Sequence, residues 1–214
     1  MTTELLEILL LSLAVSGGAV ILSSLIGIPL GAWLGLRQFV GKRTVIAVVY
    51  TGMALPPVVI GLVVYLLLSR SGPLGSLGLL FTPQAMLFAQ TLLDLPFVVG
   101  LTMAGVSSVS PHLQWQLRSI GASPSQVQWE VLREARRGML LAIATAFGRS
   151  FSEVGAVWIV GGNIEGHTRV LTTAIVLETG KGHFAFALAL GGLLLAVALA
   201  INLVIIRYQA RSSP

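Results

Sequence analysis

The chain has 214 residues, of which 55% are hydrophobic and only 10% are charged, and its mean hydropathy is +0.92. An ordinary soluble domain is about 25% charged, so this composition excludes a soluble globular protein and indicates a membrane protein. The sequence has no cysteine, which excludes disulfides, thiol chemistry and cysteine-ligated metal sites. Thirteen Lys and Arg against eight Asp and Glu give a net charge of +5, whose meaning depends on where the positive residues lie.

Five apolar runs are long enough to cross a bilayer, which takes about 20 residues in a helix. We therefore expect an all-α polytopic membrane protein, with one transmembrane domain over residues 1–214. The first run is overlong, and Gly17, Gly18, Gly27 and Pro29 could kink or divide it, so six spans remain an alternative. The runs cover approximately residues 5–36, 45–68, 85–106, 139–160 and 184–206.

The positive residues predict the orientation, because short loops rich in Lys and Arg stay cytoplasmic. With the N-terminus outside and the C-terminus inside, nine of them lie on the inner side and three on the outer side, while Arg149 falls within a span. This distribution is typical of membrane topology, so we expect the lipid bilayer and no nucleic acid as a partner. The inner residues are Arg37, Lys42, Arg43, Arg118, Arg133, Arg136, Arg137, Arg207 and Arg211, and the outer ones are Arg70, Arg169 and Lys181.

The connection over residues 107–138 predicts two short helices around a sharp corner. Ser110 and Pro111 supply an N-cap and a first helical proline, and this helix is expected to end near Gly121, which tolerates a left-handed backbone. Ser123 and Pro124 begin the second helix, with Gln126 at capping-box spacing. A helical corner with exposed apolar residues is a docking element for a partner. The alternative is an amphipathic hairpin that lies on the lipid surface.

The sequence Arg-Ser-Ile-Gly-Ala-Ser-Pro at 118–124 resembles the centre of the cytoplasmic EAA loop of ATP-binding-cassette importer permeases. Trp115–Leu117 stand where that family has Glu-Ala-Ala, and Arg133–Glu134 stand where it has Leu-Pro, so both ends depart from the motif. The resemblance implies a fold like that of type I importer permeases and a coupling helix that enters a groove of an ATPase subunit. It places ATPase coupling at Gln116, Arg118, Gly121, Ala122, Ser123 and Pro124.

Further segments resemble one branch of this family, the permeases for tungstate and molybdate. The resemblance covers about residues 10–202 and is closest to the tungstate permeases. It implies import of an oxyanion, tungstate first, with a molybdate or sulfate permease as the alternative. The segments are Ala-Leu-Pro-Pro-Val-Val-Ile-Gly at 54–61, Glu-Val-Gly-Ala at 153–156, residues 162–169 and 171–175, and, for the tungstate branch, residues 69–75, 80–83 and 180–190.

Three charged residues fall deep within the predicted spans, where such groups usually face a protein interior or a water-filled path. Arg149 and Glu153 are four positions apart, which predicts an ion pair on one helix face. The pair either marks the face that lines a path or only anchors the span against a neighbour. Asp94 is expected at a helix interface or kink, because a carboxylate would repel a divalent oxyanion.

The adjacent prolines at 56 and 57 predict a break in the second span that is either a gate or a packing kink. We expect an anion path of hydroxyl and backbone N–H groups with little fixed positive charge. The residues expected at the path or gate are Pro56, Pro57, Ser150, Ser152, Glu153 and Gly155. Those expected to face an external binding protein or the anion are Asn163, Thr168 and Arg169, although Arg169 and Lys181 could equally be solvated.

A catalytic function is not expected. The three histidines at 112, 167 and 183 lie on opposite sides of the predicted membrane, and the sequence lacks phosphate-binding, zinc-protease and hydrolase-elbow motifs. We therefore expect no metal and no cofactor on this chain, with ATP and Mg²⁺ on a partner ATPase. The resemblance implies a homodimer in the prokaryotic plasma (inner) membrane, with a cytoplasmic ATPase dimer and an extracytoplasmic oxyanion-binding protein. A membrane scaffold without transport activity is the distant alternative.

Overall fold

A computed structural model describes residues 2–211, and this part of the chain is all-helical, as the sequence predicts. Met1 and residues 212–214 of the expected domain, and the side chain of Arg211, lie outside the described residues. The helices are α1 (Thr2–Leu36), α2 (Lys42–Ala54), α3 (Pro57–Leu68), the 3-10 helix η1 (Gly75–Leu77), α4 (Pro83–Ser107), α5 (Pro111–Ser119), α6 (Pro124–Glu134), α7 (Arg136–Phe151), α8 (Gly155–Gly161), α9 (Leu171–Gly180) and α10 (Phe184–Arg211).

The five predicted apolar runs correspond to three long helices and two bent pairs of helices. α1, α4 and α10 are each long and apolar enough to cross a membrane alone. α2 with α3, and α7 with α8, reach that length only as pairs, which bend by 96° and 57° at a short break. The first run is not divided, because α1 continues through both its glycine pair and Pro29. Counting each bent pair as one span gives five spans.

Three glycines one turn apart let α1 approach α4 closely. A methyl group placed on Gly31 would lie 2.5 Å from the carbonyl oxygen of Val99, and one on Gly27 or Gly35 would lie less than 3 Å from a valine of α4. Small residues at this spacing let two helix backbones come together inside a membrane. Gly27, one of the glycines expected to kink the first span, is therefore part of the surface on which α1 packs against α4.

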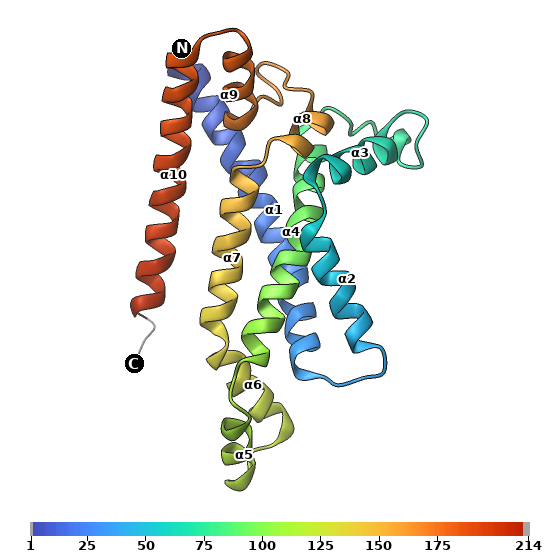
Figure 1. Ribbon diagram of the computed structural model, residues 1–214, viewed down its shortest axis with the longest axis vertical. Helices are drawn as coiled ribbons and strands as arrows, with labels where there is room; N and C mark the ends of the chain where they lie inside the picture. Colours follow the sequence, from blue (N-terminus) through green and yellow to red (C-terminus); the bar gives the residue numbers. More distant parts are fainter. Residues whose placement is uncertain (1, 212–214) are drawn as a thin grey trace.

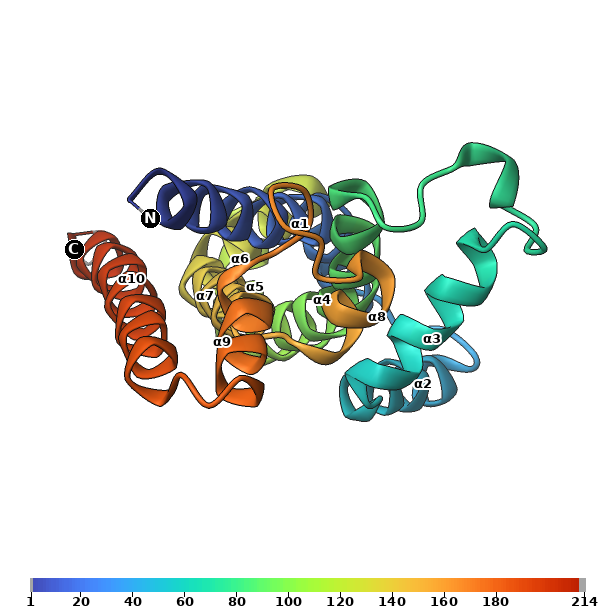
Figure 2. The ribbon, with the colours of Figure 1, turned by 90° about the horizontal axis from the view of Figure 1, so that it is seen from above.

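The helices form a central group with two flanking arms. α1, α4 and α7 lie together, α10 stands on one side, and α2 and α3 extend on the other (Figures 1 and 2). α5 and α6 project from one end of this group, and the turn between α1 and α2 and the last turns of α10 point the same way (Figure 1). The nine basic residues expected on one side of the membrane belong to these elements and to the first turns of α2 and α7.

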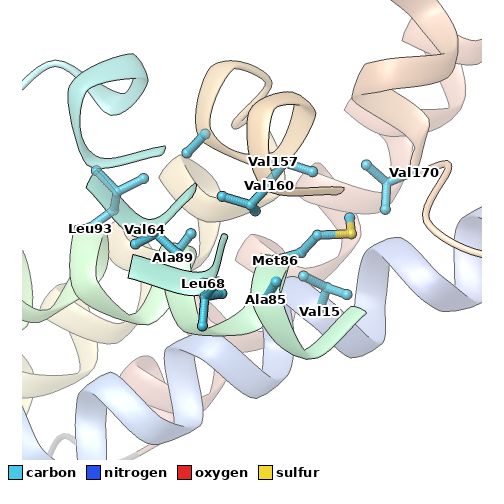
Figure 3. Packing of buried hydrophobic residues seen from close by; sticks show 11 residues of the cluster. Val15, Val64, Leu68, Ala85, Met86, Ala89, Leu93, Val157, Val160 and Val170 are labelled. Atoms are coloured by element: carbon cyan, nitrogen blue, oxygen red, sulfur yellow. The ribbon is translucent and has the colours of Figure 1, made fainter. Parts of the chain in front are cut away.

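One apolar core joins α1, α3, α4 and α8. Met86 of α4 is fully buried in it, and Val64 of α3 and Val160 of α8 belong to the same cluster (Figure 3). Val15 and Val170 close the cluster from α1 and from the segment before α9 (Figure 3). This core fixes the two bent pairs against α4.

The connection between the fourth and fifth predicted spans, residues 161–183, contains an additional helix, α9. This helix has ten residues and is too short to span a bilayer. Its first residues, from Leu171 to Ala174, are buried. Its start is fixed by the Thr173 hydroxyl, which accepts a hydrogen bond from the N–H of Val170 at 3.0 Å.

Candidate functional site

The fourth predicted span is broken between α7, which ends at Phe151, and α8, which begins at Gly155. Backbone groups freed by such a break need partners inside a membrane. The carbonyl of Ser150 accepts hydrogen bonds from the Gln90 side-chain amide at 2.9 Å and from the Ser16 hydroxyl at 3.3 Å. α4 and α1 therefore hold the broken end of α7.

The rest of the break is held by α9 and by α8 itself. The Thr172 hydroxyl donates to the carbonyl of Glu153 at 2.8 Å, and Oε1 of Glu153 accepts from the N–H of Ala156 at 3.1 Å. The Ser12 hydroxyl accepts from the N–H of Leu171 at 2.8 Å, so it satisfies a backbone donor at the start of α9. The break is thus a polar junction, at which α1, α4, α8 and α9 meet the end of α7.

Charged side chains surround this junction, but they do not pair as predicted. The predicted ion pair between Arg149 and Glu153 does not form. α7 ends between the two residues, and Glu153 instead caps the first turn of α8. The guanidinium of Arg149 lies over the ring of Phe97, 4.3 Å from its centroid. Asp94 is 1% exposed and lies on α4 within the electrostatic reach of Arg149 and Glu153. It sits at the helix interface where the sequence predicts it.

The second predicted span is broken as well, and its break lies next to the break in the fourth span. Pro57 is the first residue of α3, a position where its missing N–H has no intrahelical acceptor to lose. A methyl group placed on Gly61 would lie 2.7 Å from the Cα of Ala156, and one on Gly155 would lie 2.8 Å from the side chain of Val58. α3 and α8 therefore touch beside their breaks, so the prolines and the Glu-Val-Gly-Ala segment belong to one region.

The residues predicted for the path do not share one surface. Ser150 is 2% exposed, whereas Ser152 is exposed and its hydroxyl donates back to two carbonyls in the last turn of α7. Pro56 is exposed at the bend between α2 and α3. Glu153 and Gly155 lie between the polar junction and α3. The structure thus brings the two helix breaks together, but it places the hydroxyls of Ser150 and Ser152 on different surfaces.

The corner between α5 and α6 has the local geometry that the sequence predicts. α5 ends at Ser119, and Gly121 follows it with φ +86°. The N–H groups of Gly121 and Ala122 donate to the last carbonyls of α5 in a Schellman motif. Ser123 caps α6. Its Oγ accepts from the N–H of Gln126 at 3.4 Å, and its N–H donates to the Gln126 side chain at 2.7 Å. Both helix ends are therefore fixed by bonds within the corner.

This corner is an exposed, largely apolar surface. Trp115, Ile120 and Trp129 are 74%, 79% and 68% exposed, and apolar patches rimmed by polar groups mark interaction sites. A groove of about 590 Å³ runs along the inside of the corner, with Trp129 in its wall. Of the predicted coupling residues, Gln116, Arg118, Gly121, Ser123 and Pro124 are exposed and Ala122 is half-buried.

The opposite side of the hairpin is anchored in the bundle. Val127 and Val131 of α6 are buried against Ala32 of α1 and Val106 of α4. α4 and α7 converge at its root, where a methyl group on Gly105 would lie 3.2 Å from the Cα of Gly138. A force applied to the hairpin would therefore reach α1, α4 and α7 directly.

The predicted outer-loop residues are mostly engaged within the chain. Thr168 is 1% exposed, and its hydroxyl donates to the carbonyl of Gly161 and accepts from the N–H of Ile164. The Arg169 guanidinium lies 3.2 Å from the Glu165 carboxylate and 3.9 Å from that of Glu4. Arg169 is thus tied to α1 rather than freely solvated. Asn163 is half-buried in a left-handed conformation with φ +51°.

Sequence reasoning missed the polar residues that hold the junction. Ser12, Ser16, Gln90 and Thr172 were not singled out, yet each of them bonds to the break or to α9. A signal was present, because Ser12 and Ser16 are one helical turn apart in an apolar span and Gln90 precedes Asp94 by the same spacing.

Comparisons with known proteins agree on one kind of protein. The family described as "Binding-protein-dependent transport system inner membrane component" matches residues 27–213. The chain is 46% identical to a probable anion ABC transporter permease protein of Haloferax volcanii, over 98% of this chain and 93% of the relative. It is 42% identical to the tungstate uptake system permease protein TupB of Peptoclostridium acidaminophilum, over 96% of this chain and 90% of the relative. The crystal structure of an amino acid ABC transporter shares the fold, with a TM-score of 0.73 and 16% identity over 98% of this chain and 94% of that one.

Proposed function

This chain belongs to the family of binding-protein-dependent transport system inner membrane components, the permeases of ABC transporters, and on that premise we propose that it imports an oxyanion, namely tungstate. An external binding protein delivers the anion, and a separate cytoplasmic ATPase supplies the energy. ATP and Mg²⁺ bind to that ATPase, and this chain provides the path through the membrane. The observation that carries the choice of anion is the 42% identity, over nearly the full length of both chains, to a protein named as a tungstate permease.

The α5–α6 hairpin is the proposed docking element for the ATPase. Three large apolar side chains are exposed around a rigid corner, and the groove beside them is of the size that accommodates side chains of a partner. Its anchorage on α1, α4 and α7 supports transmission of ATPase closure to the spans. The predicted coupling residues from Gln116 to Pro124 form this tip.

The proposed path runs along the two broken spans. Discontinuous helices line substrate sites in many transporters because their breaks present polar backbone groups. α3 and α8 touch at their breaks and move against the polar junction at the end of α7. Exposed apolar residues on α3, such as Val59, Leu62 and Leu66, leave a face for a second copy. We propose a homodimer, because one chain carries one hairpin and too few spans to enclose a path.

The proposed orientation has the N-terminus outside and the C-terminus inside. The α5–α6 hairpin, the turn between α1 and α2, the first turns of α2 and α7 and the end of α10 lie at one end of the molecule (Figure 1). These elements carry the nine basic residues. Positive residues favour the cytoplasmic side. The opposite end, with Asn163 and the loop after α8, then faces the binding protein.

Docking is tested by co-purification with a candidate ATPase subunit of an ABC transporter. Gly121→Trp puts a large side chain at a left-handed position on the corner and should abolish co-purification and anion-stimulated ATP hydrolysis. Gly17→Ala, on α1 where a methyl group meets nothing within 4 Å, is the matched control and should retain both. Unchanged co-purification of Gly121→Trp would refute the docking assignment.

The anion is tested by ATP hydrolysis in vesicles that hold this chain, the ATPase and the binding protein. Tungstate should stimulate hydrolysis at lower concentration than molybdate or sulfate. If molybdate or sulfate stimulates hydrolysis at a lower concentration than tungstate, that anion is the substrate. ATP hydrolysis that none of the three anions stimulates would favour a scaffold that recruits the ATPase without transport.

A further inference from the structure

A small cavity lies beside the broken end of α7, and we propose that it binds one water molecule, which bridges Gln90 and Ser150. Its volume is about 10 Å³, at the lower limit of the roughly 10–15 Å³ that one water needs. The inference does not depend on which anion is transported. The polar residues that line the cavity are Ser12, Ser16, Gln90, Ser150, Glu153 and Thr172.

Two polar atoms of the lining have no hydrogen-bond partner among the described residues. They are Oγ of Ser150 and Oε1 of Gln90, in side chains that are 2% and 3% exposed. The amide of Gln90 cannot be turned to remove the problem, because its Nε2 donates to the carbonyl of Ser150 at 2.9 Å and a flip would bring two acceptors together. Each buried polar group without a partner costs about 1–3 kcal/mol. The site therefore requires a further donor.

Protein hydroxyls at the cavity cannot be that donor. The Ser16 and Thr172 hydroxyls already donate to carbonyl groups of the break. Both carboxylate oxygens of Asp94, which is 1% exposed, lack a partner in the described part of the chain, as Oγ of Ser150 does. The Ser150 hydroxyl makes no direct bond to Oε1 of Gln90, since both atoms lack a partner among the described residues.

A water molecule completes this arrangement with one bond for each of its hydrogens. It donates one hydrogen to Oγ of Ser150 and the other to Oε1 of Gln90. The resulting chain runs from Ser150 through the water to Gln90, and together with the direct bond from the Gln90 amide to the Ser150 carbonyl it joins α4 to α7 twice. A bridging water is nearly as favourable as a direct hydrogen bond, and it permits small movements that a direct contact would resist. The water thus lets the end of α7 shift against α4 without leaving buried groups unpaired.

Radiolytic hydroxyl labelling after rapid mixing into H₂¹⁸O tests this water, since hydroxyl radicals from a trapped water modify side chains beside it. Phe151 lines the cavity and is 3% exposed, whereas Trp129 is 68% exposed and reports bulk solvent. Immediately after mixing, Phe151 should be labelled with ¹⁶O while Trp129 carries ¹⁸O. Ser150→Val fills the cavity and should reduce labelling of Phe151 to background, whereas Ser24→Val on α1 should leave it unchanged.

Three results would overturn the inference. Phe151 that stays unlabelled in the wild-type protein would show a dry cavity, and this measurement needs no variant. Labelling that survives Ser150→Val in folded protein would place the water elsewhere. Labelling that is present in choline buffer and lost in sodium buffer would identify a cation as the occupant instead.

Discussion

The side-chain amide of Gln90 donates to the backbone carbonyl of Ser150 over 2.9 Å, across 60 positions of sequence. This bond joins α4 to the broken end of α7 and satisfies a carbonyl that the helix cannot. Gln90→Leu should therefore lower the free energy of unfolding by about 1–3 kcal/mol, because it removes the shortest bond to this carbonyl and leaves only the longer ones from the Ser16 hydroxyl and the N–H of Glu153. Thermal unfolding in detergent measures the loss. Gln84→Leu, at an exposed position in the first turn of α4, is the control, and equal melting temperatures for the two variants would contradict the role of Gln90.

Gly31 is the closest point between α1 and α4. Gly31→Ala would place a methyl group 2.5 Å from the carbonyl oxygen of Val99, so the two helices must separate. We expect a loss of several kcal/mol and a much lower yield of folded protein, measured by size-exclusion chromatography and thermal unfolding. Gly17→Ala on the same helix meets nothing within 4 Å and should be neutral or stabilising by up to about 1 kcal/mol. Similar yields for both variants would contradict the close packing of α1 on α4.

Thr168 closes the loop between α8 and α9 through two bonds of its buried hydroxyl. Thr168→Val keeps the shape of the side chain and removes both bonds, so hydrogen exchange of residues 161–170 should accelerate by about tenfold or more, corresponding to at least 1.4 kcal/mol. Thr179→Val removes only a hydroxyl that bonds within the exposed end of α9 and should leave this segment unchanged. Equal exchange in both variants would show that Thr168 does not hold the loop.

The turn between α9 and α10 should loosen in acid. Hydrogen bonds from Lys181 and then from His183 lower the pKa of Glu178 below its ordinary value of 4.5. A carboxyl group with a depressed folded-state pKa stabilises the fold above its unfolded pKa and loses this contribution as the pH falls through the folded value. Hydrogen exchange at 177–184, corrected for its intrinsic pH dependence, should therefore show less protection below about pH 4.5. Glu178→Gln should have lower protection at neutral pH and little further change in acid, and an unaltered acid response in that variant would refute the assignment.

The corner between α5 and α6 was predicted in detail because its signals are local. Ser110, Gly121, Ser123 and Gln126 each act on a backbone group within a few positions, so spacing alone specifies both helix ends. The five apolar runs are equally local, since they depend on length and hydropathy. The kink at the two prolines also follows from sequence, although nothing in the sequence indicates its angle of 96°.

The break after Phe151 could not be predicted from its own residues. The segment Ser-Glu-Val before Gly155 contains no proline, and the carbonyls at the break are bonded by residues of three other helices: Gln90 and Ser16 bond to Ser150, and Thr172 bonds to Glu153. The ion pair between Arg149 and Glu153 failed for the same reason, since its spacing assumed an unbroken helix. α9 was missed because ten residues give too weak a periodicity and its first turn is capped by Thr173 rather than by a preceding polar residue.

The central claim is that ATP hydrolysis outside this chain drives an oxyanion through it. Accumulation of tungstate inside proteoliposomes that contain this chain and its ATPase, with binding protein added on the side opposite the ATPase, measures this most directly. We predict accumulation against a gradient that requires ATP, the binding protein and an intact α5–α6 corner. Tungstate that fails to accumulate in the complete system, or that equilibrates equally well without ATP, would contradict the account.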